Sequence, residues 1–185
     1  MSVFLTSDLH FGHDKQFIFS PRGFATIEEH DEAIIRNWNT VVMPEDDVYV
    51  CGDLMLGDNE HGKSCLERLN GKLHICRGNH DTATRMEIYE NLPNVVELKD
   101  VIRFRYEKIH FYCSHYPTLT ANLEKESIYQ CEVNLFGHTH QKDNFFYELP
   151  FCYHVGVDSH NCTPVLLDNI INDIKAKIEI CKSFL

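Results

Sequence analysis

The sequence lacks features that would assign it to several common classes of protein. It has no Cys-x-x-Cys pair, so its 8 cysteines support neither a zinc knuckle nor a dithiol redox site. No apolar stretch approaches the roughly 18 residues that a membrane-spanning helix needs. Only seven residues precede Asp8, too few for a basic region followed by an apolar targeting segment. We therefore expect a cytoplasmic protein with reduced thiols that does not bind membranes.

Basic residues are scarce relative to acidic ones. The chain has 17 Lys and Arg residues against 28 Asp and Glu residues, which gives a formal net charge of −11. This charge repels nucleic-acid backbones, and no basic stripe with interleaved aromatic residues is visible. Broad nucleic-acid binding is therefore not expected. A small phosphorylated substrate is compatible with the charge, because bound divalent cations would reverse the local potential. Nothing in the sequence indicates the oligomeric state.

Histidines are abundant, and about half of the 12 follow short apolar runs. Five such runs end in Asp, Asn or His residues, and most of these ends include a glycine. The five polar segments are Asp8-Leu9-His10, Gly52-Asp53, Gly78-Asn79-His80-Asp81, Ser114-His115 and Gly137-His138-Thr139-His140. Residues two apart on a strand point to the same face, so His138 and His140 can converge on one spot. The pattern indicates a metal centre built from loops at strand ends.

The remaining pattern predicts one mixed α/β domain over residues 1–185. Thr26, with Glu29 as its reciprocal partner, predicts the start of a helix that ends before Pro44. Strands are expected at residues 2–7, 48–51, 73–76, 95–98, 101–106, 108–113, 132–137, 144–149, 152–157 and 164–167. Further helices are expected at 62–70, at 82–91 and after a cap at Asp168. Residues 118–130 fit either a helix or a loop.

The five polar segments, in this order, resemble the full motif set of calcineurin-like metallophosphoesterases. The motifs span residues 8 to 140, and flanking segments such as Trp38-Asn39 and Val155-Gly156-Val157-Asp158 are similar to a small, uncapped bacterial or phage branch. The resemblance implies a four-layer αββα sandwich, in which two mixed β-sheets are flanked by helices. It also implies that the metals lie at the ends of the strands.

The resemblance further implies a role for each motif residue. Asp8, His10 and His140 would hold one divalent metal, with Asp53 bridging to the other. The residues that complete the second metal would be Asn79, His115 and His138. His80 would not bind metal but would face the substrate phosphate, beside Asn79. The implied cofactors are two divalent ions, with Mn²⁺ preferred and Fe, Zn²⁺ or Ni²⁺ as alternatives.

The chemistry of these residue types supports the same assignment. A bridging carboxylate can hold two cations about 4 Å apart, and these lower the pKa of a water placed between them for in-line attack on phosphorus. Oxygen and imidazole ligands without a thiolate suit Mn²⁺, Fe or Zn²⁺ better than copper. His80 can stabilise the phosphoryl oxygens or protonate the leaving oxygen. Asp81 is expected either to orient His80 or to serve its own loop.

Other residues leave alternatives open. Taken singly, Asp8 or Asp53 could cap a turn, and Asn79 could be a turn residue with positive φ. His13 could reach a substrate phosphate or a carboxylate behind the metal ligands. Arg22 could clamp a phosphate or form a surface salt bridge.

The favoured function is a dinuclear metal-dependent phosphoesterase that hydrolyses a phosphodiester or phosphomonoester of a small molecule, such as a cyclic nucleotide. The segment after Asp53 lacks the second Asp and the Arg of protein serine/threonine phosphatases, which argues against a protein substrate. No Gly-x-Ser-x-Gly segment supports a serine nucleophile. The alternatives are a non-catalytic metal-binding scaffold of the same fold, or a nuclease.

Overall fold

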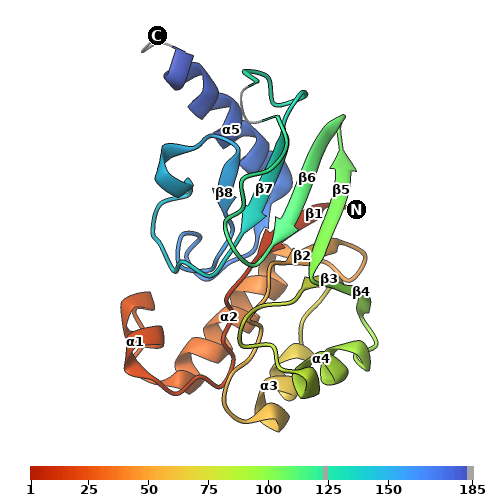
Figure 1. Ribbon diagram of the computed structural model, residues 1–185. Coiled ribbons are helices and arrows are strands. Elements are labelled where there is room, and N and C mark those ends of the chain that lie inside the picture. The colour runs from red at the N-terminus through yellow and green to blue at the C-terminus, as the bar shows by residue number, and fades with distance from the viewer. Residues whose placement is uncertain (123–124, 183–185) are drawn as a thin grey trace.

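The computed structural model describes residues 1–122 and 125–182. The first of its two β-sheets brings three predicted site loops to one edge (Figure 1). Its strand order is β4-β3-β2-β1-β9. The strands are β1 (Val3–Thr6), β2 (Asp47–Val50), β3 (Lys72–Cys76), β4 (Val95–Lys99) and β9 (Val165–Leu166). β1 to β4 are parallel and β9 is antiparallel. The carboxyl ends of β1, β2 and β3 therefore lie together, and the polar segments at 8–10, 52–53 and 78–81 follow them.

The second sheet supplies the remaining site loops. Its order is β5-β6-β7-β8, with strands β5 (Val101–Tyr106), β6 (Ile109–Ser114), β7 (Glu132–Phe136) and β8 (Cys152–His154). β5 and β6 form an antiparallel hairpin, whereas β6, β7 and β8 run parallel. A bridge between Ser7 and Gly156 joins the ends of the two sheets. His115 and the 137–140 segment, which follow β6 and β7, thereby come beside the loops of the first sheet.

The helices are α1 (Gln16–Phe19), α2 (Ile27–Val41), α3 (Asn59–Leu66), α4 (Ala83–Glu90) and α5 (Leu167–Lys182), with short 3-10 turns at Ser20–Arg22 and Phe146–Glu148. As predicted, Thr26 caps α2, and its side chain accepts a hydrogen bond from the Glu29 N–H at 3.2 Å. The Glu29 carboxylate reaches back to the Ala25 N–H rather than to Thr26. None of the described helices is long and apolar enough to cross a bilayer.

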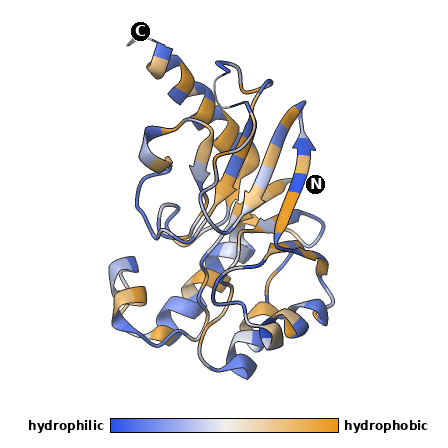
Figure 2. Cartoon of the chain, in the orientation of Figure 1, coloured by the Kyte–Doolittle hydropathy of each residue, from blue (hydrophilic) through white to orange (hydrophobic). Residues whose placement is uncertain are grey.

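Side-chain alternation along the strands creates two apolar cores, one on each face of the first sheet. Phe4 on β1 faces a core shared with α2, whose Trp38 is fully buried there. The next residue, Leu5, faces the core between the two sheets, which α5 closes with Ile170 and Ile174. Figure 2 shows α5 with alternating hydrophobic and hydrophilic residues, the pattern of a helix with one buried face. The predicted architecture of two mixed sheets flanked by helices is confirmed.

Several predicted boundaries differ from the structure. The predicted strand at 144–149 is wrong, because the 3-10 turn Phe146–Glu148 interrupts it and Tyr147 has a φ of 45°. Only Phe145 makes a bridge there, to Tyr153 of β8. The helix predicted at 62–70 begins earlier because Asp58 caps it by accepting the Glu60 N–H.

The start of the last helix and residues 118–130 can also be compared with their predictions. α5 begins at Leu167, so Asp168 lies in its first turn rather than preceding it as a cap. The described part of 118–130 contains no helix, and residues 123–124 of that segment lie outside the described residues. No disulfide bond joins any two cysteines of the described residues.

Candidate metal centre

Most of the predicted ligand residues adopt an uncommon backbone conformation. The five with φ between 48° and 66° are Asp8, His10, Asp53, His138 and His140. A left-handed conformation costs a non-glycine residue on the order of 1–3 kcal/mol and persists only where the surroundings enforce it. Here the loops enforce it on one another, because the N–H groups of Asp8 and His10 donate to the carbonyls of Gly52 and Asp53 at 3.0 and 3.1 Å. Such strain is typical of functional sites.

Two glycines let the loops approach closely. A Cβ atom at Gly78 would collide with the Asp53 carboxylate, and one at Gly137 would collide with Ser7 and Asp8. Any larger residue at either position would push apart loops that carry predicted ligands. The glycines of these two motifs are therefore required by the packing of the site.

The first group of side chains surrounds one oxygen of Asp8. Its Oδ2 accepts the His138 N–H at 2.9 Å, whereas its Oδ1 is buried and has no hydrogen-bond partner among the described residues. That Oδ1 lies 3.8 Å from His10 Nε2 and 3.9 Å from His140 Nε2, and the two nitrogens are 3.3 Å apart. A buried carboxylate oxygen without a donor is costly, but a cation among these three atoms would satisfy it. The group therefore fits a metal ion.

The second group converges on the side-chain oxygen of Asn79. Asn79 Oδ1 lies 2.8 Å from His115 Nε2 and 2.9 Å from His138 Nδ1. The Nδ1–H of His115 donates to the Cys51 carbonyl at 2.8 Å, which leaves the lone pair of Nε2 directed into the site. Oxygen and imidazole donors again suit a divalent ion.

Asp53 lies between the two groups. Its Oδ2 is 3.8 Å from His10 Nε2 of the first group and 3.5 Å from His115 Nε2 of the second. Burial raises the pKa of Asp53 and of Asp8, and it lowers the pKa of His10. These pKa shifts are those of a buried site, in which the charged form of each carboxylate requires positive charge nearby. The structure thus brings all seven predicted ligands together around the position predicted for a bridging carboxylate.

His80 and His13 occupy the solvent side of this centre. The side chain of His80 is 43% exposed, and its Nε2 is 3.9 Å from Asp53 Oδ2. The imidazole rings of His13 and His10 have their centroids 5.4 Å apart. Burial and the neighbouring His80 lower the pKa of His13. Both His80 and His13 line the cavity over the centre.

That cavity has a volume of about 520 Å³. One wall consists of metal-centre side chains, and Lys142 also lines the cavity. The apolar part of the lining consists of Phe17, Ile18, Pro21 and Leu56. The Phe17 side chain is 69% exposed and stands perpendicular to His13. The cavity therefore combines polar ligands with an apolar surface suited to an organic group.

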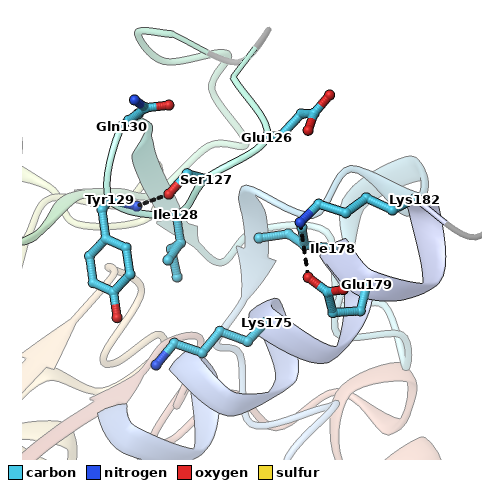
Figure 3. A pocket seen from close by; sticks show the side chains of 9 residues that line it. All are labelled: Glu126, Ser127, Ile128, Tyr129, Gln130, Lys175, Ile178, Glu179 and Lys182. Atoms are coloured by element: carbon cyan, nitrogen blue, oxygen red, sulfur yellow. Dashed lines mark hydrogen bonds and ion pairs between the residues drawn. The ribbon is translucent and has the colours of Figure 1, made fainter.

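A groove of similar volume, about 510 Å³, lies between residues 126–130 and α5. Figure 3 shows Tyr129 and Ile128 on one side of it and Lys175, with Glu179 paired to Lys182, on the other. None of the nine lining residues belongs to a predicted motif. We therefore assign the candidate site to the cavity over the metal centre.

Asp81 does not orient His80, so that prediction is wrong. Its Oδ2 accepts the N–H groups of Asp53 and Gly78 at 2.9 and 2.8 Å. Its Oδ1 accepts the Tyr89 hydroxyl at 2.8 Å. These bonds place Asp81 beneath the centre, where it ties the Asp53 loop to its own loop. The alternative that Asp81 serves its loop agrees with the structure.

Arg22 is not placed to clamp a phosphate, which corrects a second prediction. Its side chain is only 1% exposed, and it donates to Asp158 through Nε at 3.0 Å and Nη2 at 2.8 Å. Nη2 also donates to the Asp8 carbonyl, and Nη1 reaches His30 Nε2 at 2.8 Å. The guanidinium is therefore committed to protein acceptors behind the centre, and it cannot also bind substrate.

Asp158 is a site residue to which sequence analysis assigned no role. The Nδ1–H of His140 donates to its Oδ2 at 2.8 Å, which directs the His140 Nε2 lone pair toward Asp8. Burial disfavours the Asp158 carboxylate, but His140 and Arg22 outweigh it and hold its pKa well below the usual range. Burial lowers the pKa of His140, but its hydrogen bond to Asp158 and the negative charge of Asp8 outweigh burial and raise that pKa overall. The sequence feature that could have pointed to Asp158 is the segment Val155-Gly156-Val157-Asp158, which follows β8.

The chain is similar to known proteins over most of its length. The family model for the calcineurin-like phosphoesterase superfamily domain matches residues 1–151. The uncharacterized protein MJ1445 of Methanocaldococcus jannaschii is 33% identical over 181 residues, covering 94% of this chain and 91% of that protein. The gene 66 protein of Mycobacterium phage D29 is 26% identical over 197 residues, covering 94% and 98%. The crystal structure of AQ665 from Aquifex aeolicus, a protein of unknown function, has the same fold, with a TM-score of 0.68, 21% identity and coverage of 92% and 98%.

Proposed function

The chain belongs to the calcineurin-like phosphoesterase superfamily, and from that premise we propose that it is a dinuclear metal-dependent phosphoesterase. The observation that carries the proposal is the position of Asp53 Oδ2, within 3.8 Å of imidazole nitrogens from both ligand groups. The unpartnered Asp8 Oδ1 supports it, because a buried carboxylate oxygen requires a cation or a donor. The substrate is a phosphodiester or phosphomonoester of a small molecule.

Seven side chains would hold the two ions. Asp8, His10 and His140 would hold one ion, and Asp53 would contact both. The ligands of the second ion would be Asn79, His115 and His138. When bound, two divalent ions supply an activated water and neutralise charge on the phosphoryl group. For these oxygen and nitrogen donors we prefer two Mn²⁺ ions, with Fe, Zn²⁺ or Ni²⁺ as alternatives.

His80 would complete the chemistry from the cavity side. Its backbone N–H is fixed to Asp53 Oδ1 at 2.9 Å, while its ring stays partly exposed. From this position Nε2 can donate to a phosphoryl oxygen or protonate the leaving oxygen. A positioned general acid of this kind contributes roughly 10²–10⁴ in rate. His13 would contact the substrate from the same side.

The cavity supports a small substrate with an organic group. The apolar surface of Phe17, Pro21 and Leu56 faces the same space as the ligands. A nucleoside or aryl group could pack there while its phosphate faces the centre. The net charge of −11 disfavours an extended nucleic acid. A cytoplasmic location is proposed with this function, because the described part of the chain contains no disulfide bond.

The test measures hydrolysis of an aryl phosphodiester and of the matching monoester, with Mn²⁺, Ni²⁺, Zn²⁺ or a chelator. Asp53→Asn should abolish turnover, and His80→Ala should reduce it about 10²–10⁴-fold while metal binding persists. Exposed Asp100→Asn is the control and should match the wild type. Tight metal binding without turnover of either ester would favour the scaffold instead, and cleavage of oligonucleotides alone would favour a nuclease.

A further inference from the structure

A second cluster of metal-ligand side chains lies outside the candidate metal centre. It consists of Asp31 on α2 together with His61 and Cys65 on α3, and none of them belongs to the five motifs. One ligand atom from each residue lies within 4.8 Å of the other two. His61 and Cys65 are four residues apart, so they share one face of α3. That face meets Asp31.

The distances suit a tetrahedral zinc ion. With Zn–N of about 2.0–2.1 Å and Zn–S of about 2.3 Å, a tetrahedral ion sets the nitrogen and sulfur about 3.6 Å apart. His61 Nε2 lies 3.6 Å from Cys65 Sγ. The same geometry requires about 3.4 Å between nitrogen and carboxylate oxygen. His61 Nε2 lies 2.7 Å from Asp31 Oδ2, so the ring has to withdraw by about 0.7 Å. The His61 side chain is 42% exposed, which leaves room for that movement and for a water as fourth ligand.

The chemistry of the cluster also suits zinc. Asp31 is 2% exposed, and its carboxylate already accepts from His30 Nδ1–H at 2.8 Å and from the Gly12 N–H at 2.9 Å. A cation at Oδ2 would compensate its buried charge more completely than neutral donors do. One thiolate, one imidazole and one carboxylate form a mixed ligand set of the kind that zinc accepts. Burial raises the pKa of the Cys65 thiol to about 11, so zinc binding would displace its proton.

We propose that Asp31, His61 and Cys65 form a third metal site, which takes a structural zinc ion separate from the candidate metal centre. The ion would join α2 to α3. Because Asp31 Oδ2 also holds the Gly12 N–H, the ion would fix the loop between His10 and His13 as well. The proposal does not depend on phosphoesterase activity.

Cobalt(II) provides a selective probe, because thiolate-to-cobalt charge transfer gives a near-ultraviolet absorption. The ligands of the candidate metal centre include no thiolate, so they cannot produce this band. The full chain, reduced and free of metal, would be titrated with cobalt alone. We expect the wild type to develop the band and to bind about one equivalent more than Cys65→Ser, which should lack the band. Cys181→Ser, which removes a half-buried thiol from α5, is the matched control and should retain it.

Two further variants separate the possible outcomes. Asp8→Asn removes a ligand of the candidate metal centre and should keep the band, so loss of phosphoesterase function would leave this result unchanged. His61→Asn removes the imidazole ligand at a side chain that is 42% exposed. It should weaken cobalt binding at this site at least tenfold, since loss of an outer-shell partner alone costs about 10–100-fold. Absence of the band from cobalt-saturated wild type, or its persistence in Cys65→Ser, would overturn the proposal.

Discussion

Replacing Asp158 with Asn should weaken the binding of one metal ion and leave the other unchanged. The carboxylate accepts two kinds of donor, His140 Nδ1–H at 2.8 Å and the Arg22 guanidinium at 2.8 and 3.0 Å. An Asn side chain has only one acceptor oxygen. If that oxygen turns to Arg22, its NH₂ group faces His140 Nδ1, which must then give up its hydrogen. The hydrogen would move to Nε2, the atom that faces Asp8, and would block coordination there.

The size of the effect follows from this geometry. Loss of a carboxylate that orients a ligating histidine reduces metal affinity by about 10–100-fold, or about 1.4–2.7 kcal/mol. Arg22 is buried and loses its charged partner, so the metal-free protein should lose about 3 kcal/mol of stability. For a domain of this size, that loss lowers the melting temperature by about 6–12 °C.

Calorimetric titration with Mn²⁺ would resolve the two ions in wild type and in Asp158→Asn. The ion held by Asn79, His115 and His138 should bind as in the wild type, because Asp158 contacts none of these residues. Asp143→Asn, which changes an exposed carboxylate, is the control. Unchanged affinity for both ions, or an equal loss for both, would refute the assignment of Asp158 as the residue that positions His140.

Three other predictions concern pH, the buried charge and the apolar wall. Burial lowers the pKa of His154 to about 3, so as the pH falls below about 6.5 this residue becomes protonated in the unfolded chain but not in the folded protein. Between pH 7 and pH 5, this one residue should lower the free energy of unfolding by about 2 kcal/mol. In denaturation of the metal-free protein, His154→Gln should remove that pH dependence and exposed His110→Gln should keep it. An unchanged slope of stability against pH in His154→Gln would contradict the reasoning. Asp8→Asn should abolish binding of one Mn²⁺ but stabilise the metal-free protein by about 1 kcal/mol, because burial raises the pKa of Asp8 and so disfavours its charged form. A lower stability of this variant in thermal unfolding would count against the prediction. Phe17→Ala should raise KM several-fold for an aryl phosphodiester and leave KM for a methyl diester unchanged, and equal effects on both esters would exclude a role in binding the organic group.

The sequence predicted the converging residues because each follows a short apolar run. Parallel strands place their carboxyl ends at one edge, so Asp8, Asp53 and Asn79 could be grouped before any distance was known. The left-handed φ angles of Asp8 and Asp53 could not be predicted in the same way, because hydrogen bonds between separate loops enforce them. The failed strand at 144–149 had the right composition, but its aromatic side chains pack on Phe136 and Tyr153 instead of extending a sheet.

The roles of charged residues were harder to predict than their positions. Arg22 and Asp158 are 136 residues apart, and their pairing depends on how the 3-10 turn before α2 meets the segment that follows β8. Asp81 follows His80 directly, but the turn points its carboxylate toward the protein interior and leaves the His80 ring facing solvent. Local sequence cannot distinguish these directions. His61 and Cys65 did carry a readable signal, since four-residue spacing on a helix aligns them, but their partner Asp31 lies on another helix.

The two sheets meet at the ligand groups, and this arrangement links metal binding to folding cooperativity. One group takes Asp8 and His10 from the first sheet and His140 from the second. The other takes Asn79 from the first sheet and His115 and His138 from the second. An ion in either position would be released whenever one sheet opened away from the other, so each bound ion penalises that opening by mass action. Ions at these positions would therefore convert two sheets that share one core into a single unit that unfolds together.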